Sequence, residues 1–570
     1  MNRVLFCVLA TLFLSRLAVA TTSIDLDGGG WTFRTTLEEQ WKPVSVPHTW
    51  LVDQGHEKYI GHAMYQREFE MPSLGMGKVA RLHFDAVYDV AQVWVNGKLA
   101  GTHEGGYTAF EFDITRLVHP GTNYILVDVD NTPTFTSIPA LATGHPSTDK
   151  YIRNGPGKAT IVGWLPYGGI VRPVRIEISD AVYFRSVKID ADPNLKTDVA
   201  IVTAKAILHN AGTKAVSATV KGEIAGLTAI FQAAHVPANG DAAVIWKGTL
   251  NKAHLWSVRD PFLYDARLQV ADDTFTAHVG VRKIQVDGIR LLLNGREVHL
   301  NGANRVSEDM KEGLRESDAI IERDLSDMLA DNMRMMRIAH YPQAQALLDF
   351  ADRHGMLIIP EAGNWNFSRW QMADPGIRAR WKAQMKEMME QDWNHPSVIA
   401  WSVGNEYESY TQEGRDWTRD MKAFTLSLDS TRLITFASRY TSDAAVKTGA
   451  DEGSQYCDFV SINVYGDYAR RFDRVHELFP NKPVFVTEFG KMGEEGVHDP
   501  ERIANITEAM TALKQRPYMI GASLWTWNDY RSFIRGTPAD GIRRWGVVNT
   551  EREHRDSWQA VQKLFETELP

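Results

Sequence analysis

The first third of the chain alternates short apolar stretches with turn residues, which is the pattern of an all-β domain. Residues 78–84 form one apolar stretch, and residues 90–95 form another that runs into Asn96-Gly97, a dipeptide typical of tight hairpins. Residues 124–129 place Ile125, Val127 and Val129 on one face of a strand. No long amphipathic helix interrupts this region. We therefore predict a jelly-roll β-sandwich over residues 21–180.

A second β region follows over residues 181–282. Its β-branched stretches are bounded by turn residues and spaced as in an immunoglobulin-like sandwich of about 100 residues. The expected strands are 199–208, 215–224, 242–250 and 264–270. The region contains few candidate reactive groups, so we interpret it as a spacer.

After Gly288 the hydrophobic period changes from two to that of alternating helices and strands. Ser317 can cap a helix whose apolar positions recur at helical spacing, namely Ile321, Leu325, Met328 and Leu329. Residues 343–354 predict a second helix, which ends at Gly355.

The strands between these helices are continuously apolar, which indicates that both faces of each strand are buried, as in a parallel sheet. Eight units in about 280 residues predict a (β/α)8 barrel over residues 283–570. The expected strands are 298–300, 333–338, 356–360, 398–401, 433–437, 459–464, 484–486 and 519–525. In such a barrel the reactive side chains lie at the C-terminal ends of the strands.

Composition and net charge narrow the class of protein and its possible partners. The 570 residues are 44% hydrophobic and 23% charged, as in ordinary globular proteins, and the formal net charge of −9 argues against nucleic acid as a partner. The 17 Trp exceed what core filling needs. Self-association into a homo-oligomer stays open.

Residues 1–20 have the pattern of a secretory signal. Arg3 precedes an apolar run over residues 4–14, which is too short to span a bilayer, and Ala18-Val19-Ala20 is a small-residue cleavage pattern. Removal of this segment leaves Cys457 without an internal disulfide partner. We expect an exported protein, periplasmic or secreted, with no membrane insertion once the signal is removed.

Two glutamates stand directly after apolar strands of the predicted barrel. Glu406 closes the fourth strand and Glu488 closes the seventh, so both side chains are expected at the mouth of the barrel. Paired carboxyls in this relation are what glycoside hydrolysis requires, and in a retaining enzyme they stand ~5–5.5 Å apart. Either glutamate alone could instead be an ion pair at the rim.

Several motifs along the chain give this sequence a resemblance to glycoside hydrolase family 2, which contains β-galactosidases, β-glucuronidases and β-mannosidases. The motifs are Trp94-Val95-Asn96-Gly97, Glu104-Gly105-Gly106-Tyr107, Gly168-Gly169-Ile170-Val171-Arg172-Pro173, Pro261-Phe262-Leu263-Tyr264, Gly280-Val281-Arg282 and Asn301-Gly302-Ala303-Asn304-Arg305. The resemblance covers essentially all of the chain after the signal. It implies that Glu406 is the general acid/base and Glu488 the nucleophile, and we expect Glu488 to titrate below Glu406.

The same resemblance implies roles for neighbouring side chains at the strand ends. Arg337 would hold the nucleophile, His340 would contact sugar hydroxyls, Asn405 would bind the 2-hydroxyl, and Tyr465 would donate to the nucleophile. Trp525 would be the platform under the sugar ring. Further candidates for the pocket are Asn364, Trp365, Trp527, Asn528 and Asp529. Each could instead be an ordinary packed or ion-paired residue.

Departures from known members bear on cofactor and substrate. Glu361 is followed by Ala-Gly-Asn-Trp, without the His that accompanies it in magnesium-dependent β-galactosidases, so we predict no cofactor and no required metal. The Asn-x-Lys with which β-glucuronidases hold the uronate carboxylate is absent, although Arg531, Arg535, Arg543 and Arg544 could replace it. The chain ends about twenty-five residues after Trp545, so the additional C-terminal β domains of large β-galactosidases are not expected.

We therefore expect a retaining exo-β-glycosidase that acts on an oligosaccharide or glycoside, with a neutral β-galactoside as the first choice of substrate. One alternative is a β-glucuronidase on the same scaffold. The other is a non-catalytic carbohydrate-binding protein, for which paired carboxylates would have no use.

Overall fold

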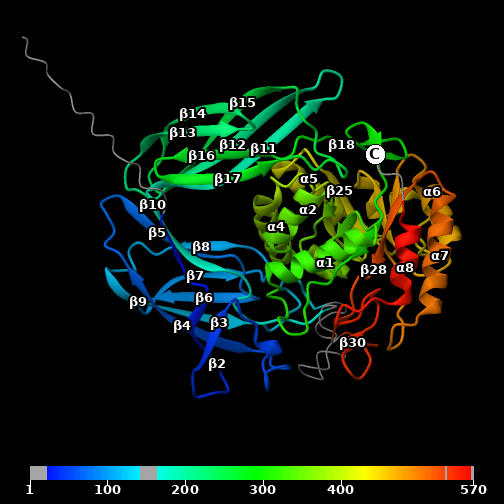
Figure 1. Cartoon of the computed structure of the whole chain (residues 1–570), viewed down its shortest axis with the longest axis horizontal. Coiled ribbons are helices and arrows are strands. Elements are labelled where there is room, and N and C mark those ends of the chain that lie inside the picture. The colour runs from blue at the N-terminus through cyan, green and yellow to red at the C-terminus, as the bar shows by residue number, and fades with distance from the viewer. Residues whose placement is uncertain (1–21, 142–163, 533, 535, 567–570) are drawn as a thin grey trace, which may run out of the picture.

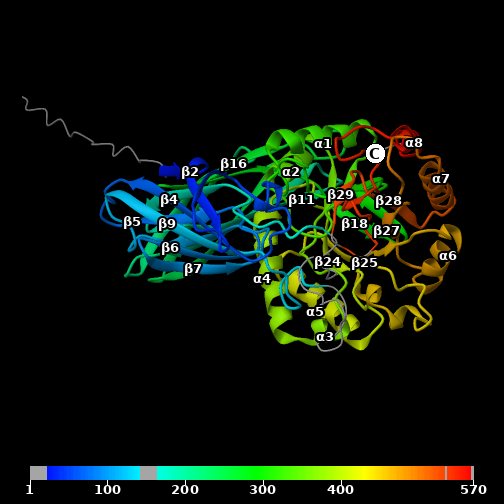
Figure 2. The same ribbon diagram turned by 90° about the horizontal axis from the view of Figure 1, so that it is seen from below.

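The computed structural model describes residues 22–141, 164–532, 534 and 536–566. It consists of two β-sandwiches side by side and a helix-lined barrel that contacts both (Figure 1). Figure 2 shows the N-terminal sandwich and the barrel at opposite ends of the molecule's long axis. The predicted signal segment, residues 1–20, lies outside the described residues. Among the helices that the structure describes, none is long and apolar enough to cross a membrane.

The N-terminal domain is a sandwich of a six-stranded sheet, in the order β3-β2-β4-β9-β6-β7, and a four-stranded sheet, in the order β1-β10-β5-β8. All pairings are antiparallel, and the Asn96-Gly97 turn has positive φ at both residues, as a tight β6–β7 hairpin requires. The strands are β1 Thr22–Asp25, β2 Gly28–Thr35, β3 Lys42–Val46, β4 His62–Met71, β5 Lys78–Phe84, β6 Val90–Val95, β7 Lys98–Glu104, β8 Phe110–Asp113, β9 Gly121–Asp130 and β10 Val174–Asp180.

The middle domain packs a three-stranded sheet, β11-β12-β15, on a four-stranded sheet, β14-β13-β16-β17. Alternating apolar residues of both sheets form its core. The strands are β11 Val182–Asn194, β12 Val199–Asn210, β13 Val216–Ile224, β14 Leu227–Val236, β15 Gly240–Asn251, β16 Tyr264–Val270 and β17 Asp273–Val279. A small sheet of β18 Ile284–Asp287, β19 Arg290–Leu293 and β20 Arg296–Glu297 leads into the barrel.

The barrel is a parallel sheet of eight strands that closes through bridges such as Ile358 to Val398. Its strands are β21 Gly302–Asn304, β22 Met335–Arg337, β23 Leu357–Ile359, β24 Ala400–Asn405, β25 Leu433–Ser438, β26 Val460–Asn463, β27 Val484–Phe489 and β28 Met519–Trp525. The expected first strand, residues 298–300, lies just before β21. The other seven strands lie where the sequence predicted them.

Helices cover the outside of this sheet. They are α1 Asp318–Ala330, α2 Gln345–His354, α3 Arg369–Ala373, α4 Pro375–Asp392, α5 Gln412–Leu428, α6 Tyr468–Leu478, α7 Pro500–Lys514 and α8 Asp556–Leu564. Ser317 precedes α1 and the predicted face of that helix, Ile321, Leu325 and Met328, is buried. After β28 a short hairpin of β29 Tyr530–Arg531 and β30 Ile542–Arg543 returns over the mouth of the barrel.

Candidate active site

A cavity of about 450 Å³ lies at the C-terminal ends of the barrel strands. Both predicted glutamates line it, Glu406 from the end of β24 and Glu488 from β27. Glu406 has φ of +50°, a conformation that costs a non-glycine residue free energy and that clusters at functional sites. The two carboxylates therefore share one pocket, as the strand-end positions predicted.

Arg337 organises the floor of this pocket. Its guanidinium is completely buried and donates to Glu488 Oε1 at 2.8 Å, to Glu361 Oε2 at 3.0 Å and to Asn405 Oδ1 at 2.8 Å. A planar fork with five donors is suited to hold several acceptors in fixed positions. Because Glu361 is also bound by Ser402 and His340, the cation and its two carboxylates form one rigid polar unit.

Glu488 has a second donor in Tyr465, whose hydroxyl lies 2.7 Å from Oε2. Burial raises the pKa of Glu488 above its ordinary value and the charge of Glu406 adds to this, while Arg337, His340 and the Tyr465 hydrogen bond lower it. Burial of Glu488 works against the low pKa that a nucleophile needs, and the order in which the two glutamates titrate stays a prediction.

Glu406 is held on both of its oxygens. Asn463 Nδ2 donates to Oε1 at 3.0 Å and Arg439 Nη1 donates to Oε2 at 3.2 Å. Asn463 also donates to Asn405 Oδ1 at 3.1 Å, which links the two glutamates through Asn405 and Arg337. With its oxygen engaged twice, Asn405 keeps the Nδ2 donor unpartnered in the described structure.

Aromatic rings form the walls. His340 and Trp525 stack with ring centroids 5.4 Å apart, and Trp365 lies 6.3 Å from His340. Trp164 of the N-terminal domain completes this wall, with its centroid 5.6 Å from His340. It is fixed by a 2.9 Å hydrogen bond from its indole to the Tyr107 hydroxyl. The first domain thus supplies part of the pocket.

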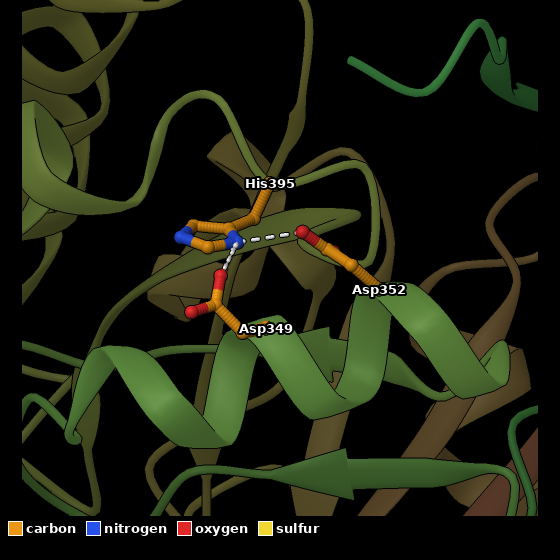
Figure 3. A group of neighbouring side chains, drawn as sticks. All are labelled: Asp349, Asp352 and His395. Carbon is orange, nitrogen blue, oxygen red and sulfur yellow. Dashed lines mark hydrogen bonds and ion pairs between the residues drawn. The ribbon is translucent and has the colours of Figure 1, made fainter. Parts of the chain in front are cut away.

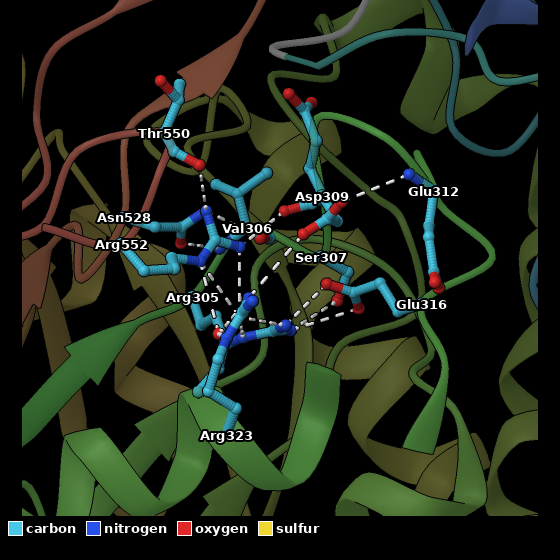
Figure 4. A network of polar contacts seen from close by, with 12 residues as sticks. Arg305, Val306, Ser307, Asp309, Glu312, Glu316, Arg323, Asn528, Thr550 and Arg552 are labelled. Carbon is cyan, nitrogen blue, oxygen red and sulfur yellow. Dashed lines mark hydrogen bonds and ion pairs between the residues drawn. The ribbon is translucent and has the colours of Figure 1, made fainter. Parts of the chain in front are cut away.

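Arg337 and Asn405 lie beneath the cavity lining, where they contact the residues that hold the glutamates, and four further sequence candidates lie outside the lining. Asn364 is buried behind β24 with its amide against Gly404. Asn528 exchanges hydrogen bonds with the backbone of Val306 at 3.1 Å, within the network drawn in Figure 4. Trp527 is buried, and Asp529 forms a 2.7 Å ion pair with Arg555. These four residues support the loops around the pocket instead of facing a sugar.

The network in Figure 4 also fixes the loop that follows β21. Arg305 is buried and pairs with Glu316 and, at 2.7 Å, with Asp324, which in turn accepts from Arg552 at 3.0 Å. Two cations and two carboxylates therefore tie α1 to the C-terminal loop of the barrel. Removing one partner of such a buried set leaves an uncompensated charge, so the loop is held firmly.

The sequence did not identify several residues that line the cavity. Asn463 ends β26 and satisfies the same strand-end rule that found Tyr465, so the rule could have identified it. Tyr530 and Trp545 lie on and after the β29–β30 hairpin, which also carries Arg543, a residue that the sequence did single out as a possible carboxylate contact. Arg439 follows β25, and Arg471 lies in α6. The local sequence of these segments does not predict that they fold back over the ends of the barrel strands.

A possible metal-ligand set lies away from this pocket. Asp349 and Asp352 of α2 face His395, and these are the one group of three such ligands within reach of a common ion among the residues described (Figure 3). His395 Nδ1 lies 2.6 Å from Asp352 Oδ2. Burial lowers and Asp352 raises the pKa of His395, with a net upward direction, so a proton on this ring satisfies the carboxylates.

Comparison with known proteins agrees with the architecture. Three models match: "Glycosyl hydrolases family 2, sugar binding domain" over residues 32–138, "Glycosyl hydrolases family 2" over 182–282, and "Glycosyl hydrolases family 2, TIM barrel domain" over 284–543. The chain belongs to glycoside hydrolase family 2. It is therefore a glycoside hydrolase of a retaining family, and the non-catalytic alternative is set aside.

Individual relatives are distant. The β-glucuronidase of Sus scrofa is 24% identical over 550 residues, which cover 88% of this chain and 80% of that protein. A β-galacturonidase from Eisenbergiella tayi, solved with galacturonate, has a TM-score of 0.85 at 23% identity and covers 96% of this chain and 97% of its own. A β-glucuronidase from Ruminococcus gnavus has a TM-score of 0.83 at 23% identity, covering 96% and 98%. At these identities the solved structures support the fold.

Proposed function

We propose that this family 2 hydrolase removes a terminal β-linked uronic acid, with a glucuronide as the preferred substrate. The observation that carries the proposal is a pair of arginines without acidic partners at the cavity. Arg471 and Arg543 line it, and within the described part of the chain neither forms an ion pair with a carboxylate, although Arg543 hydrogen-bonds to Tyr530. Both Nε atoms are buried without a hydrogen-bond partner.

Position supports Arg543 as the contact for the sugar carboxylate. It lies on the β29–β30 hairpin with its guanidinium 5.9 Å from the Trp545 ring, and Trp545 contacts Tyr465 edge-on. This places the cation on the side of Glu488, where the sugar ring must lie if Glu488 attacks its anomeric carbon. An arginine fork fits a carboxylate better than a lysine does.

The other three arginines that the sequence singled out are placed differently. Arg531 donates to Glu308 and to Tyr167, Arg544 pairs with Asp540, and Arg535 lies outside the described residues. The neutral β-galactoside expected from the sequence would leave Arg471 and Arg543 without an anion. Relatives named β-glucuronidase and β-galacturonidase support the acidic substrate.

In the proposed mechanism the Glu488 carboxylate attacks the anomeric carbon while Glu406 protonates the departing glycosidic oxygen. Water, deprotonated by Glu406, then cleaves the glycosyl ester and restores both groups with net retention. Arg337 and Tyr465 hold Glu488 in line, and the unpartnered Nδ2 of Asn405, buried just beneath the cavity, would donate to the 2-hydroxyl. Trp525 would carry the sugar ring.

The test is a panel of 4-nitrophenyl β-glycosides with Arg543→Gln. A hydrogen bond to a charged group contributes about 1.5–3 kcal/mol, so kcat/KM for the glucuronide should fall about 10- to 100-fold while the galactoside changes little. Arg544→Gln is the matched control, since Arg544 is the next residue and pairs with Asp540 outside the cavity. Preference of the wild type for galactoside, or equal losses on both sugars, would overturn the proposal.

A further inference from the structure

The acid side of the cavity carries a cation of its own. Arg439 follows β25, lines the cavity and donates to Glu406, yet its side chain is 54% exposed. A guanidinium has five N–H donors, and the contact with Glu406 uses one. Because more than half of the side chain is exposed, the remaining donors are accessible to a ligand.

The place of Arg439 relative to the two glutamates decides which part of a substrate it would meet. A general acid stands beside the leaving oxygen, whereas the nucleophile stands on the opposite side of the anomeric carbon. Arg439 contacts Glu406 Oε2, while Glu488 is held by Arg337 and Tyr465. Arg439 therefore borders the leaving group, and Arg543 borders the sugar that is removed.

Two tyrosines extend this border. The Arg439 guanidinium lies 5.9 Å from the Tyr440 ring, and the Tyr440 and Tyr410 rings are 4.9 Å apart. Tyr440 and Tyr410 are both half-buried. An aromatic ring offers a flat apolar face and a polar hydroxyl, which together suit the C–H face and the hydroxyls of a pyranose.

The charge of Arg439 selects among leaving groups. The guanidinium donates to Glu406 through one N–H, and its other donors can hold a carboxylate or a sulfate on the leaving group. A neutral leaving group offers no such anion.

We propose that Arg439, Tyr440 and Tyr410 form a subsite for an acidic leaving sugar, one that carries a carboxylate or a sulfate next to the bond that is cleaved. The proposal rests on Glu406 being the general acid of the proposed function. With Arg543 it predicts a substrate that is anionic on both sides of the scissile bond, as at the end of an acidic glycan.

The experiment compares four substrates with one terminal sugar: a 4-nitrophenyl glycoside, a disaccharide with a neutral second sugar, and disaccharides with a carboxylated or a sulfated second sugar. In Arg439→Gln, kcat/KM for at least one acidic disaccharide should fall on the order of tenfold relative to the neutral one, mainly through KM, as for one charge-assisted hydrogen bond. Arg439→Lys should keep part of the preference. Arg419→Gln is the control, since Arg419 is 51% exposed and pairs with Asp416 on the outer face of α5.

Salt gives a second readout. Raising the ionic strength should raise KM for the acidic disaccharide more in the wild type than in Arg439→Gln, because the exposed charge is screened. Equal losses on neutral and acidic disaccharides, or no loss on either acidic one, would overturn the subsite. If no uronide is cleaved by the wild type, the proposed function fails instead, and the Arg439 comparison is made with the terminal sugar that is accepted.

Discussion

The setting of Glu488 shows how single residues tune the proposed nucleophile. Burial pushes the pKa of its carboxyl up, and two donors, Arg337 and Tyr465, oppose that shift. A retaining nucleophile must be ionised before it can attack. The acidic limb of the pH profile should therefore report on these donors.

Tyr465→Phe removes one hydrogen bond to the ionised form of Glu488, so the pKa of Glu488 rises further. We expect the acidic limb of kcat/KM against pH to move to higher pH, and kcat/KM at the optimum to fall about 10- to 100-fold. Tyr124→Phe is the control, because the Tyr124 hydroxyl donates to Glu68 on an exposed face of the N-terminal sandwich. An unshifted acidic limb would contradict the assigned role.

Glu406→Ala tests the acid on the other side of the bond. Substrates with poor leaving groups should lose several orders of magnitude in kcat, whereas activated aryl glycosides should lose less, because only the former need a proton. Added azide should restore turnover and give the β-glycosyl azide. Formation of the α-azide would contradict retention.

The strand-end rule identified residues by position along the chain, and its success depended on where each side chain points. Glu406, Glu488, His340 and Tyr465 were placed on the cavity because they end or follow barrel strands. Asn528 also follows a barrel strand, β28, but its side-chain amide is hydrogen-bonded to the backbone of Val306 and does not face the cavity. The direction of a side chain in a loop is set by tertiary contacts, which one sequence does not display.

At the scale of elements, the β29–β30 hairpin is the part that carries Arg543 to the pocket. Its strands are two residues each, and the hairpin is held from outside: Arg531 donates to Glu308 at 2.9 Å and to the Tyr167 hydroxyl of the N-terminal domain at 2.7 Å. So short a hairpin has little stability of its own. Arg531 is therefore a positioning residue for Arg543.

Arg531→Met should loosen this hairpin and raise KM for the uronide about tenfold, while KM for a neutral glycoside stays near its wild-type value, since a buried charged hydrogen bond is worth about 1.5–3 kcal/mol. The readout is the ratio of kcat/KM for glucuronide to that for galactoside. Arg470→Gln, on an exposed turn of α6, serves as the control. If Arg531→Met lowers the thermal stability but leaves the glucuronide-to-galactoside ratio of kcat/KM unchanged, Arg531 stabilises the fold without positioning Arg543.

Long, strongly patterned elements were predictable and short ones were not. The α1 helix and the β9 strand follow directly from hydrophobic period. The β14 and β17 strands of the middle domain escaped notice because Ala, Gln and His dilute their β-forming residues. The two-residue strands β29 and β30 are joined by a long loop and pair only through tertiary context, whereas β20 pairs with β19 across the tight turn at Asn294-Gly295.

Across the whole molecule, buried ion pairs join the domains. Lys188 of the middle domain lies 2.9 Å from Asp429 of the barrel, which is completely buried and also pairs with Arg432 at 2.9 Å. Desolvation alone would raise the pKa of Asp429, but Arg432 and Lys188 hold it well below the ordinary value. The pair depends on the two domains being docked.

Lys188→Met should lower the free energy of unfolding by about 1–3 kcal/mol, because Asp429 keeps one of its two cations. Thermal unfolding followed by circular dichroism would measure this. Lys205→Met is the control. Lys205 lies opposite Lys188 on the neighbouring strand β12, but its side chain is exposed. A melting temperature unchanged in both variants would show that this contact does not hold the domains together.

Trp164 makes the cavity of the barrel depend on the N-terminal domain. Both glutamates belong to the barrel, yet one wall of the chamber they share is encoded in the first domain. A barrel produced by itself would open that chamber to solvent. Recombination that exchanges N-terminal domains between members of the family would change which sugars enter while leaving the catalytic machinery untouched.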